Sequence, residues 1–361
     1  MAKSVTRICG ILTSGGDAPG LNAAIRGVCR TAIDMYDIDI LGFEHGYRGL
    51  VDNKFKIMKP SDFSGILAQG GTILGTSREK PFKDKNWEIS GGASPVERII
   101  ENYKKNKLDC LVVLGGNGTN TTGALLAKEG LNIIGLPKTI DNDIVETDIT
   151  FGFHTALTVA TEAIDRLHST ASSHNRVMVI EVMGHKAGWL SLYSGVAGGG
   201  DVVLLPEIPY RIDSIARHLE DRVHHGKTFS IVVVAEGALS VEESRLDKKT
   251  FKKSREQMSG SIGYRVAREI EESTGIESRV TVLGYLQRGG TPAAFDRVLA
   301  SQFGTAAANM LAEGDYGKMV ALHDNKIVRV PLEKIAGRTK TVPLDDRMIE
   351  TARDVGTCLG D

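Results

Sequence analysis

Short apolar runs, each followed by a glycine-rich or charged loop, constrain this sequence more than any other feature. The first run, at residues 7–13, stops before Gly15 and Gly16, and residues 21–33 then carry apolar side chains at helical spacing. Similar runs follow at residues 38–43, 109–114, 132–136, 177–182, 230–235 and 281–286. Apolar strands that alternate with helical segments predict an α/β fold with a largely parallel sheet covered by helices on both faces.

The loops after these runs account for an excess of glycine. The chain has 41 glycines among 361 residues, about 11% against roughly 7% in average proteins. In open parallel sheets, ligands bind beyond the carboxyl ends of the strands. The residues that follow each run are therefore the candidates for chemistry.

Composition and charge narrow the class of protein. The chain carries 44 Lys and Arg, 45 Asp and Glu, and a formal net charge of −1, so nothing suggests non-specific nucleic-acid binding. Its length predicts two domains or one large one. The four cysteines form no CxxC pair and no zinc spacing, which is typical of reduced thiols in a cytosolic protein. No apolar stretch suits a secretory signal or a membrane span, so we expect a cytoplasmic location.

Two glycine-rich loops suit phosphate. Residues 13–20, with Gly15 and Gly16, and residues 115–119, with Gly116 and Gly118, each lead from an apolar run toward a helix. Glycine lets backbone N–H groups curve around an anion, and a helix N-terminus adds a positive dipole. Tight strand-to-helix turns use the same glycines, so the phosphate reading stays open for either loop alone. The sequence has neither a GxxxxGK[ST] motif nor a well-placed GxGxxG.

A third loop places two carboxylates close together. Asp141 and Asp143 are two residues apart, so an extended segment would direct both side chains to one face. One carboxylate could take a proton from a hydroxyl while the other holds Mg²⁺. A turn with local side-chain hydrogen bonds is the alternative.

Arginines near the ends of the predicted strands complete the set. Guanidinium groups bind phosphate with two hydrogen bonds, and the candidates are Arg78, Arg176, Arg279 and Arg288. Glycine-rich loops, paired aspartates, a threonine and arginines together favour phosphoryl transfer, in which catalysis is mostly positioning and charge stabilisation.

Over essentially its whole length, the sequence resembles the phosphofructokinase family. The segments that carry the resemblance, in family order, are LTSGGDAPGLNAAIRG, GGTILGTSR, PKTIDNDI, FGFHTAL, EAIDRL, SSHNRVMVIEVMGH, AGGGDVVLLPE and VLGYLQRGGTPAAFDR. The resemblance implies two doubly wound, mainly parallel-sheet α/β domains with the active site in the cleft between them. Residues 1–152 and 287–337 would form the phosphoryl-donor domain, and residues 153–286 and 338–361 the fructose 6-phosphate domain.

The resemblance also implies an activity. The expected reaction is the ATP-dependent phosphorylation of D-fructose 6-phosphate at its 1-hydroxyl, the committing step of glycolysis, with Mg²⁺ and a homotetramer. Asp141 would be the general base, Thr139 would bind the transferred phosphoryl group, and Asp143 would support the metal, with Asn117 as a second metal position. The residues expected at the phosphoryl donor are Gly15, Arg78, Gly116, Asn117, Gly118 and Thr119.

The sugar phosphate would be held from two subunits. The residues expected from within one subunit are Thr139, Asp141, Met183, Gly184, His185, Glu236, Tyr285 and Arg288, of which Arg288 also counts as catalytic. Arg176 and Arg279 match arginines that reach the sugar phosphate from a neighbouring subunit. Asn117, His185 and Tyr285 depart from the residues usual in the family, which are Asp, Arg and His, respectively.

The phosphoryl donor depends on two positions. Pyrophosphate-using relatives usually carry Asp at the position of Gly118 and Lys at the position of Lys138. Gly118 admits ATP, whereas Lys138 is the pyrophosphate-like choice, and we favour ATP. The alternatives are a pyrophosphate-dependent enzyme, a non-catalytic regulatory subunit that binds sugar phosphate, and a kinase of the diacylglycerol or NAD type, against which the TIDND and QRGG segments argue.

Overall fold

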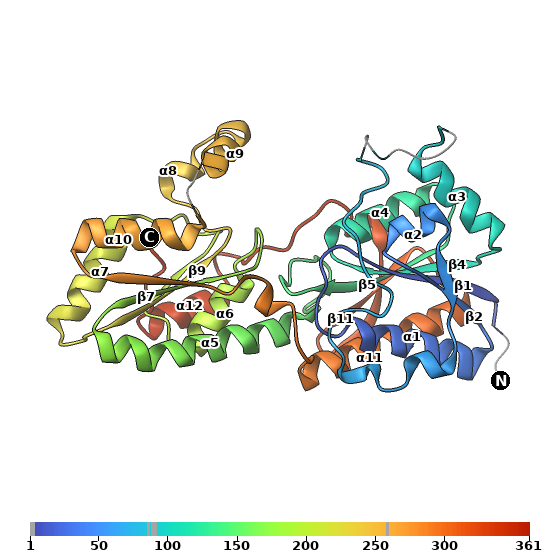
Figure 1. Cartoon of the computed structure of the whole chain (residues 1–361), viewed down its shortest axis with the longest axis horizontal. Helices are drawn as coiled ribbons and strands as arrows, with labels where there is room; N and C mark the ends of the chain where they lie inside the picture. Colours follow the sequence, from blue (N-terminus) through green and yellow to red (C-terminus); the bar gives the residue numbers. More distant parts are fainter. Residues whose placement is uncertain (1–3, 85–86, 88–91, 258–259) are drawn as a thin grey trace. The chain divides into compact units, whose positions relative to one another are not determined.

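The computed structural model describes residues 4–84, 87, 92–257 and 260–361. The chain divides into two compact units, each built around its own sheet (Figure 1). The first unit consists of Met1–Ile140, Ile144–Thr155 and Arg288–Thr339, and the second of Asp141–Asp143, Ala156–Gln287 and Lys340–Asp361. Asp141–Asp143 thus clusters with the second unit, although the boundaries implied by the family resemblance place these residues in the first domain. The assignment of one unit to the phosphoryl donor and the other to the sugar phosphate stays a prediction.

The sheet of the first unit is mainly parallel. Its strands are β1 (Ile8–Ser14), β2 (Asp39–Phe43), β3 (Phe55–Ile57), β4 (Cys110–Gly115), β5 (Ile133–Thr139), β6 (Phe151–Gly152), β11 (Lys318–His323) and β12 (Lys326–Pro331). Seven of them follow the order β12-β11-β5-β4-β1-β2-β3, and β6 pairs with β5. Only the edge strands β3 and β12 run antiparallel to their neighbours within the described chain. The predicted α/β class is therefore confirmed for this unit.

Helices cover both faces of this sheet, which explains why its central strands are apolar runs without alternation. In β4, Val112 and Leu114 pack on one face, and Leu111 and Val113 pack on the other. The first face is covered by α1 (Leu21–Tyr36) and α11 (Ala294–Glu313) and the second by α2 (Tyr47–Asp52), α3 (Pro95–Lys105) and α4 (Asn117–Lys128). Short 3-10 turns complete the unit: η1 (Pro60–Phe63), η2 (Ile66–Ala68) and η4 (Leu332–Lys334).

The second unit has a four-stranded parallel sheet within the described residues. Its strands, in spatial order, are β10 (Ser278–Val282), β7 (Val177–Val182), β9 (Ser230–Ala235) and β8 (Val202–Leu204). One face packs against α7 (Ile212–His224) and α10 (Ile262–Thr274). The opposite face carries α5 (Phe153–His174), α6 (Trp189–Ala197) and α12 (Arg347–Asp354) (Figure 1). The remaining elements are α8 (Val241–Ser244), α9 (Lys248–Gln257) and η3 (Gly284–Gln287).

The structure agrees with most of the predicted strands and differs at two places. The runs at residues 177–182 and 230–235 coincide with β7 and β9. The sequence predicts a loop at residues 115–119 before a helix, whereas the helix α4 already starts within them, at Asn117. The strand predicted at residues 281–286 is wrong in extent. Gly284, with φ of 48°, ends the extended chain after β10, and Tyr285 is 73% exposed in η3.

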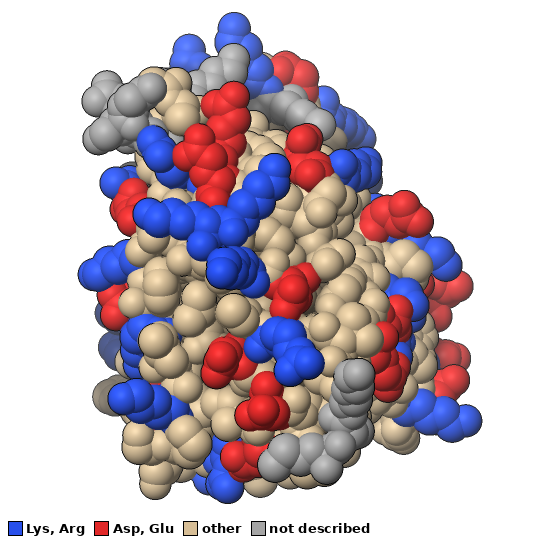
Figure 2. All heavy atoms as spheres, turned by 90° about the vertical axis from the view of Figure 1, so that its right-hand side faces the viewer, with Lys and Arg blue, Asp and Glu red and all other residues tan. Residues whose placement is uncertain are grey.

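Charged side chains of both signs are interspersed on the face of the molecule drawn in Figure 2. This mixture fits a chain with a formal net charge of −1. Among the described residues, no helix has both the length and the apolar character needed to cross a bilayer.

A buried carboxylate fixes the start of α5. Asp296 accepts hydrogen bonds from Gly152 N at 2.9 Å, Thr155 N at 2.7 Å and Thr155 Oγ1 at 2.6 Å. Burial raises the pKa of Asp296, and these hydrogen bonds oppose the rise. Three donors offset the cost of burying the charge, so α11 holds the segment that leads from β6 into α5.

Two glycines let α1 and α11 pack closely. A Cβ at Gly27 would lie 2.9 Å from the carbonyl oxygen of Ser301, and a Cβ at Gly304 would lie 2.6 Å from that of Ala24. Side-chain carbons do not approach backbone atoms so closely. The two helices therefore keep this separation only with glycine at both positions.

We expect Gly304→Ala to destabilise the first unit, because the added methyl group must push α1 away. Overpacking of this kind costs about 1–3 kcal/mol, more than the roughly 1 kcal/mol that alanine gains over glycine within a helix. Urea denaturation would measure the free energy of unfolding, with Thr305→Ala, an exposed neighbour on α11, as the control. A free energy as high as that of the wild type would show that the close approach of the helices is not required.

Candidate active site

The loop after β1 is held in a conformation that requires glycine. Gly15 has a φ of 89°, in the left-handed region. Its N–H donates to the carbonyl oxygen of Ser77 at 2.8 Å, and its own carbonyl accepts from Thr76 Oγ1 at 2.6 Å. Residues 76–77 therefore fix the loop, and the exposed Arg78 follows them directly.

The first turn of α4 lies beside the end of β1. Gly116 is the N-cap residue of α4, and Asn117, Gly118 and Thr119 form the first turn. The first N–H groups of a helix have no partner within it and carry partial positive charge, which suits an anion. Thr119 Oγ1 donates to the carbonyl oxygen of Ser14 at 3.1 Å and ties this turn to β1.

Two cationic side chains lie against Gly16. Lys138, near the end of β5 and 3% exposed, donates from Nζ to the carbonyl oxygen of Gly16. Arg288 donates from Nη1 to the carbonyl oxygen of Asp17 at 3.0 Å. A Cβ at Gly16 would lie 2.6 Å from that same nitrogen. The loop after β1 thus brings two positive charges to the edge of the sheet where Thr139, the last residue of β5, also lies.

The acidic pair lies in a turn. Asp141 and Asp143 are 9% and 8% exposed. Asn142, between them, has a φ of 51°, a left-handed conformation in which asparagine is enriched. Of the two alternatives that the sequence left open, the extended segment with both carboxylates on one face is therefore wrong, and the left-handed Asn142 agrees with a turn. Lys340 fixes the turn, since its N–H donates to the carbonyl oxygen of Asp143 at 2.7 Å and its Nζ to Asn142 Oδ1 at 3.1 Å.

Glu236, the first residue after β9, joins the loop that follows β7. Its Oε1 accepts the N–H of His185 at 2.7 Å, and the loop reaches this position through left-handed residues, Gly184 with φ of 142° and His185 with φ of 53°. Burial raises the pKa of Glu236, the hydrogen bond from His185 opposes the rise, and the charge of Asp141 adds to it. The second unit therefore brings Gly184, His185, Glu236 and Asp141 together.

Gln287 is a positioning residue that the sequence reasoning missed. It is fully buried, and its Oε1 accepts the N–H of Met183 at 2.8 Å. The sequence singled out Arg288 in the same segment. One signal for it was present in the sequence, a polar residue between an apolar run and Arg288. Its hydrogen-bond partner, Met183, could not be inferred because it lies 104 residues away in sequence.

Arg176 and Arg279 lie at the other end of the second sheet. Arg176 precedes β7 and Arg279 is the second residue of β10, whereas Met183 follows the carboxyl end of β7. The six residues of β7 span about 20 Å at roughly 3.3 Å per residue. Both arginines bind the Glu277 carboxylate, Arg176 at 2.6 Å. The structure therefore does not bring them to the residues around Glu236.

The carboxylates of Asp141 and Asp143 are oxygen donors of the kind that binds Mg²⁺. Among the described residues, no group of three or more His, Cys, Asp or Glu side chains is arranged to hold a metal ion. Mg²⁺ commonly binds one or two carboxylates together with substrate phosphates and water instead of a cage of protein ligands. Two buried carboxylates suit that mode.

Comparison with known proteins assigns the family. The family model described as phosphofructokinase matches residues 8–311. This chain belongs to the phosphofructokinase family. The expectation drawn from the family motifs is thereby confirmed. A relative from Spirochaeta thermophila named ATP-dependent 6-phosphofructokinase is 63% identical over 100% of both chains. A relative from Bacteroides thetaiotaomicron named ATP-dependent 6-phosphofructokinase 3 is 52% identical and covers 97% of this chain and 99% of its own.

Solved phosphofructokinases share the fold. The structure of Pichia pastoris phosphofructokinase in the T-state has a TM-score of 0.79 at 35% identity and covers 91% of this chain. This chain spans 35% of that longer chain. A pyrophosphate-dependent phosphofructokinase from Nitrosospira multiformis has a TM-score of 0.80 at 22% identity over 93% of this chain and 86% of its own, which shows the fold alone.

We expect Gly16→Ala to lower phosphofructokinase activity by displacing Arg288. The clash involves the far end of a flexible side chain, so the melting temperature should change little while the guanidinium moves. A double-mutant cycle with Arg288→Ala tests this, because two changes that act through one group are not additive. Activity losses that multiply in the double variant would show that Gly16 acts independently of Arg288.

Proposed function

We propose that this chain transfers the terminal phosphoryl group of ATP to the 1-hydroxyl of D-fructose 6-phosphate, which yields fructose 1,6-bisphosphate and ADP. The observation that carries the proposal is the full-length relationship to proteins named ATP-dependent 6-phosphofructokinase, at 63% identity in the first case. We place the reaction in the cytoplasm, as the committing step of glycolysis.

The donor is bound by backbone groups of the first unit. Gly15, Gly116 and the first turn of α4 present N–H groups to the phosphates, and Asn117, Gly118 and Thr119 line this turn. Arg78 adds a guanidinium from the loop that holds Gly15. Positioning and charge stabilisation by such groups are the main contributions of a protein to phosphoryl transfer.

The acceptor is activated by Asp141. Its carboxylate takes the proton of the 1-hydroxyl as the hydroxyl oxygen attacks the phosphorus and ADP leaves. Thr139 and Arg288 bind the transferred phosphoryl group. Met183, Gly184, His185, Glu236 and Tyr285 hold the sugar phosphate.

Mg²⁺ would be held by Asp143 and, through its amide oxygen, by Asn117. When bound, it neutralises charge on the phosphates of the donor. Carboxylate and amide oxygens are ligands that suit Mg²⁺.

A homotetramer explains the position of Arg176 and Arg279. Within the chain these arginines lie at the amino ends of β7 and β10, about one strand length from Met183. A neighbouring subunit would bring their guanidinium groups to the sugar phosphate. There they would bind the phosphate in place of the Glu277 carboxylate.

Parallel coupled assays of the wild type with MgATP and with pyrophosphate test the function directly. We expect turnover of fructose 6-phosphate with MgATP. Turnover with pyrophosphate alone would support the second candidate, a pyrophosphate-dependent enzyme, which the buried Lys138 favours. Binding of fructose 6-phosphate without turnover from either donor would support a regulatory subunit.

In the same assays, Gly118→Asp should lower kcat/KM for ATP about a hundredfold or more, because like charges at close range cost several kcal/mol. The nearest atom to a Cβ at position 118 is Lys80 Cε at 4.0 Å, and an acidic residue in a first helical turn is favourable, so the fold should tolerate the change. Gly118→Ala is the matched control for bulk without charge. Equal losses in both variants would contradict the charge argument.

Asp141→Asn should lower kcat by roughly 10²–10⁴-fold, because the amide has nearly the shape of the carboxylate but cannot take a proton. The KM values for ATP and fructose 6-phosphate should change little. The same assay supplies the measurement, with Asp148→Asn as a control for loss of one negative charge. A rate within a factor of ten of the wild type would exclude Asp141 as the base.

A further inference from the structure

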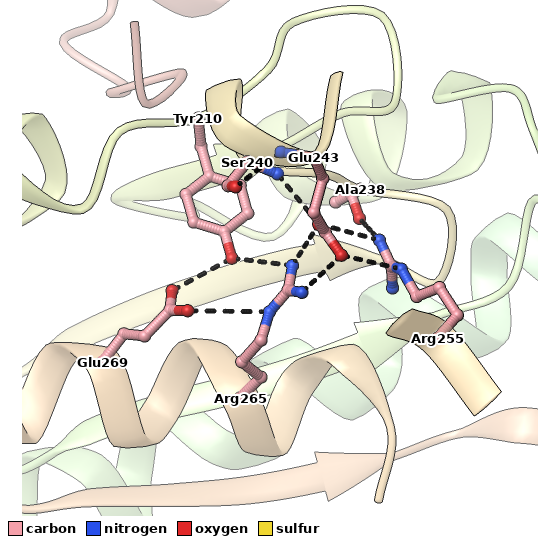
Figure 3. A network of polar contacts seen from close by, with 7 residues as sticks. All are labelled: Tyr210, Ala238, Ser240, Glu243, Arg255, Arg265 and Glu269. Atoms are coloured by element: carbon pink, nitrogen blue, oxygen red, sulfur yellow. Dashed lines mark hydrogen bonds and ion pairs between the residues drawn. The ribbon is translucent and has the colours of Figure 1, made fainter. Parts of the chain in front are cut away.

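A buried carboxylate between two arginines holds the segment of the second unit that follows β9 (Figure 3). Glu243, on α8, is 8% exposed. Arg265 of α10 binds it through two parallel hydrogen bonds of 2.6 Å, and Arg255 of α9 lies 3.2 Å from the same carboxylate. The phenol of Tyr210 accepts from Arg265 Nη2 at 3.0 Å and donates to Glu269 at 3.0 Å. The network therefore joins three helices through side chains alone.

This network attaches residues 240–257, which we name the α8–α9 arm, to α10 and Tyr210. The arm is highly charged, and its described residues contribute nothing to the hydrophobic cluster that α7 and α10 form on this face of the sheet. Its first helix has only four residues, too few to be stable alone. Glu243 also closes the capping box with Ser240, where Ser240 N donates to Glu243 Oε2 at 3.1 Å and Glu243 N donates to Ser240 Oγ at 3.3 Å. One carboxylate thus shapes α8 and fastens the arm.

The arm is linked to the candidate active site by a contact with the backbone of the residues that follow Glu236. Arg255 donates from Nη2 to the carbonyl oxygen of Ala238, two residues after Glu236. On the other side, a Cβ at Gly237 would lie 2.1 Å from the carbonyl oxygen of His185, so the segment is packed against the loop after β7. Tyr210 N donates to the carbonyl oxygen of Leu239 at 3.0 Å. Residues 236–239 are therefore fixed between the β7 loop and groups of the network.

We propose that Glu243 is a positioning residue for the acceptor sugar: by holding Arg255 against Ala238, it fixes Glu236, so the α8–α9 arm sets the affinity for fructose 6-phosphate without touching it. The inference rests on the proposed function, in which Glu236 holds the sugar. Removal of Glu243 takes from Arg255 the carboxylate that neutralises it and leaves Arg265 with the carboxylate of Glu269, at 3.6 Å. The two guanidinium groups repel each other, and Arg255 then releases the carbonyl of Ala238.

Steady-state kinetics of the full chain with Glu243→Gln tests the proposal. We expect KM for fructose 6-phosphate to rise about tenfold, the equivalent of one lost hydrogen bond to a charged group, while kcat and KM for ATP stay within about twofold. Glu242→Gln, an exposed neighbour on the same helix, is the matched control and should leave all three constants unchanged. A lower melting temperature with an unchanged KM for fructose 6-phosphate would overturn the inference and leave Glu243 a purely structural residue.

Arg255→Gln keeps the proposal testable if Glu243→Gln does not fold. This change removes the bond to Ala238 but leaves the two bonds between Glu243 and Arg265, so α8 keeps its attachment. KM for fructose 6-phosphate should rise as in Glu243→Gln, and Arg255→Lys should restore part of the loss, since lysine keeps the charge but not the fork of donors. An unchanged KM in Arg255→Gln would contradict the role of the arm. Failure of the proposed function is distinguishable, because the wild type itself would then show no turnover of fructose 6-phosphate with MgATP.

Discussion

The part of the candidate site that lies in the first unit depends on the absence of a side chain at Gly16. Any side chain there would meet the guanidinium group of Arg288, and the carbonyl of Gly16 is already bound to Lys138. Lys138 lies near the end of β5, and Arg288 begins the last segment of the first unit. The missing side chain of Gly16 thus lets Arg288 lie against the same short loop whose backbone binds Lys138. At this position, one of the many glycines of the chain has a definite role, because it leaves room for a guanidinium group.

The sequence predicted the parts of the fold that depend on local pattern. β7 and β9 are buried on both faces, so their apolar runs have sharp limits that can be read directly. The strand expected at residues 281–286 failed because Tyr285 and Leu286 are apolar but exposed. The sequence alone could not decide between an extended segment and a turn at Asn142, since the contacts of Lys340 that fix this residue come from a distant part of the chain.

Buried polar residues were the hardest part of the site to predict. The many charged side chains of residues 241–259 are typical of a solvated surface segment, yet Glu243 within this segment is buried. Its burial depends on two arginines that become its neighbours only when α9 and α10 have formed. The burial of Gln287 was equally hard to predict, because the hydrogen bond that compensates for it comes from Met183, which is distant in sequence. Charge patterns in a sequence show which residues carry charge but not which of them find partners.

Two buried carboxylates with raised pKa values illustrate how structural and functional roles can be separated. Burial is the largest cause of the rise in the pKa of both Asp296 and Glu236. Asp296 accepts three hydrogen bonds at the start of α5, so the fold itself explains why the charge is kept there. Glu236 lies near a second carboxylate, Asp141, which raises its pKa further. The charge of one carboxylate beside another does not stabilise a fold, and acids with shifted pKa values concentrate at functional sites. The contacts that hold residues 236–239 from both sides therefore keep Glu236 within the field of Asp141.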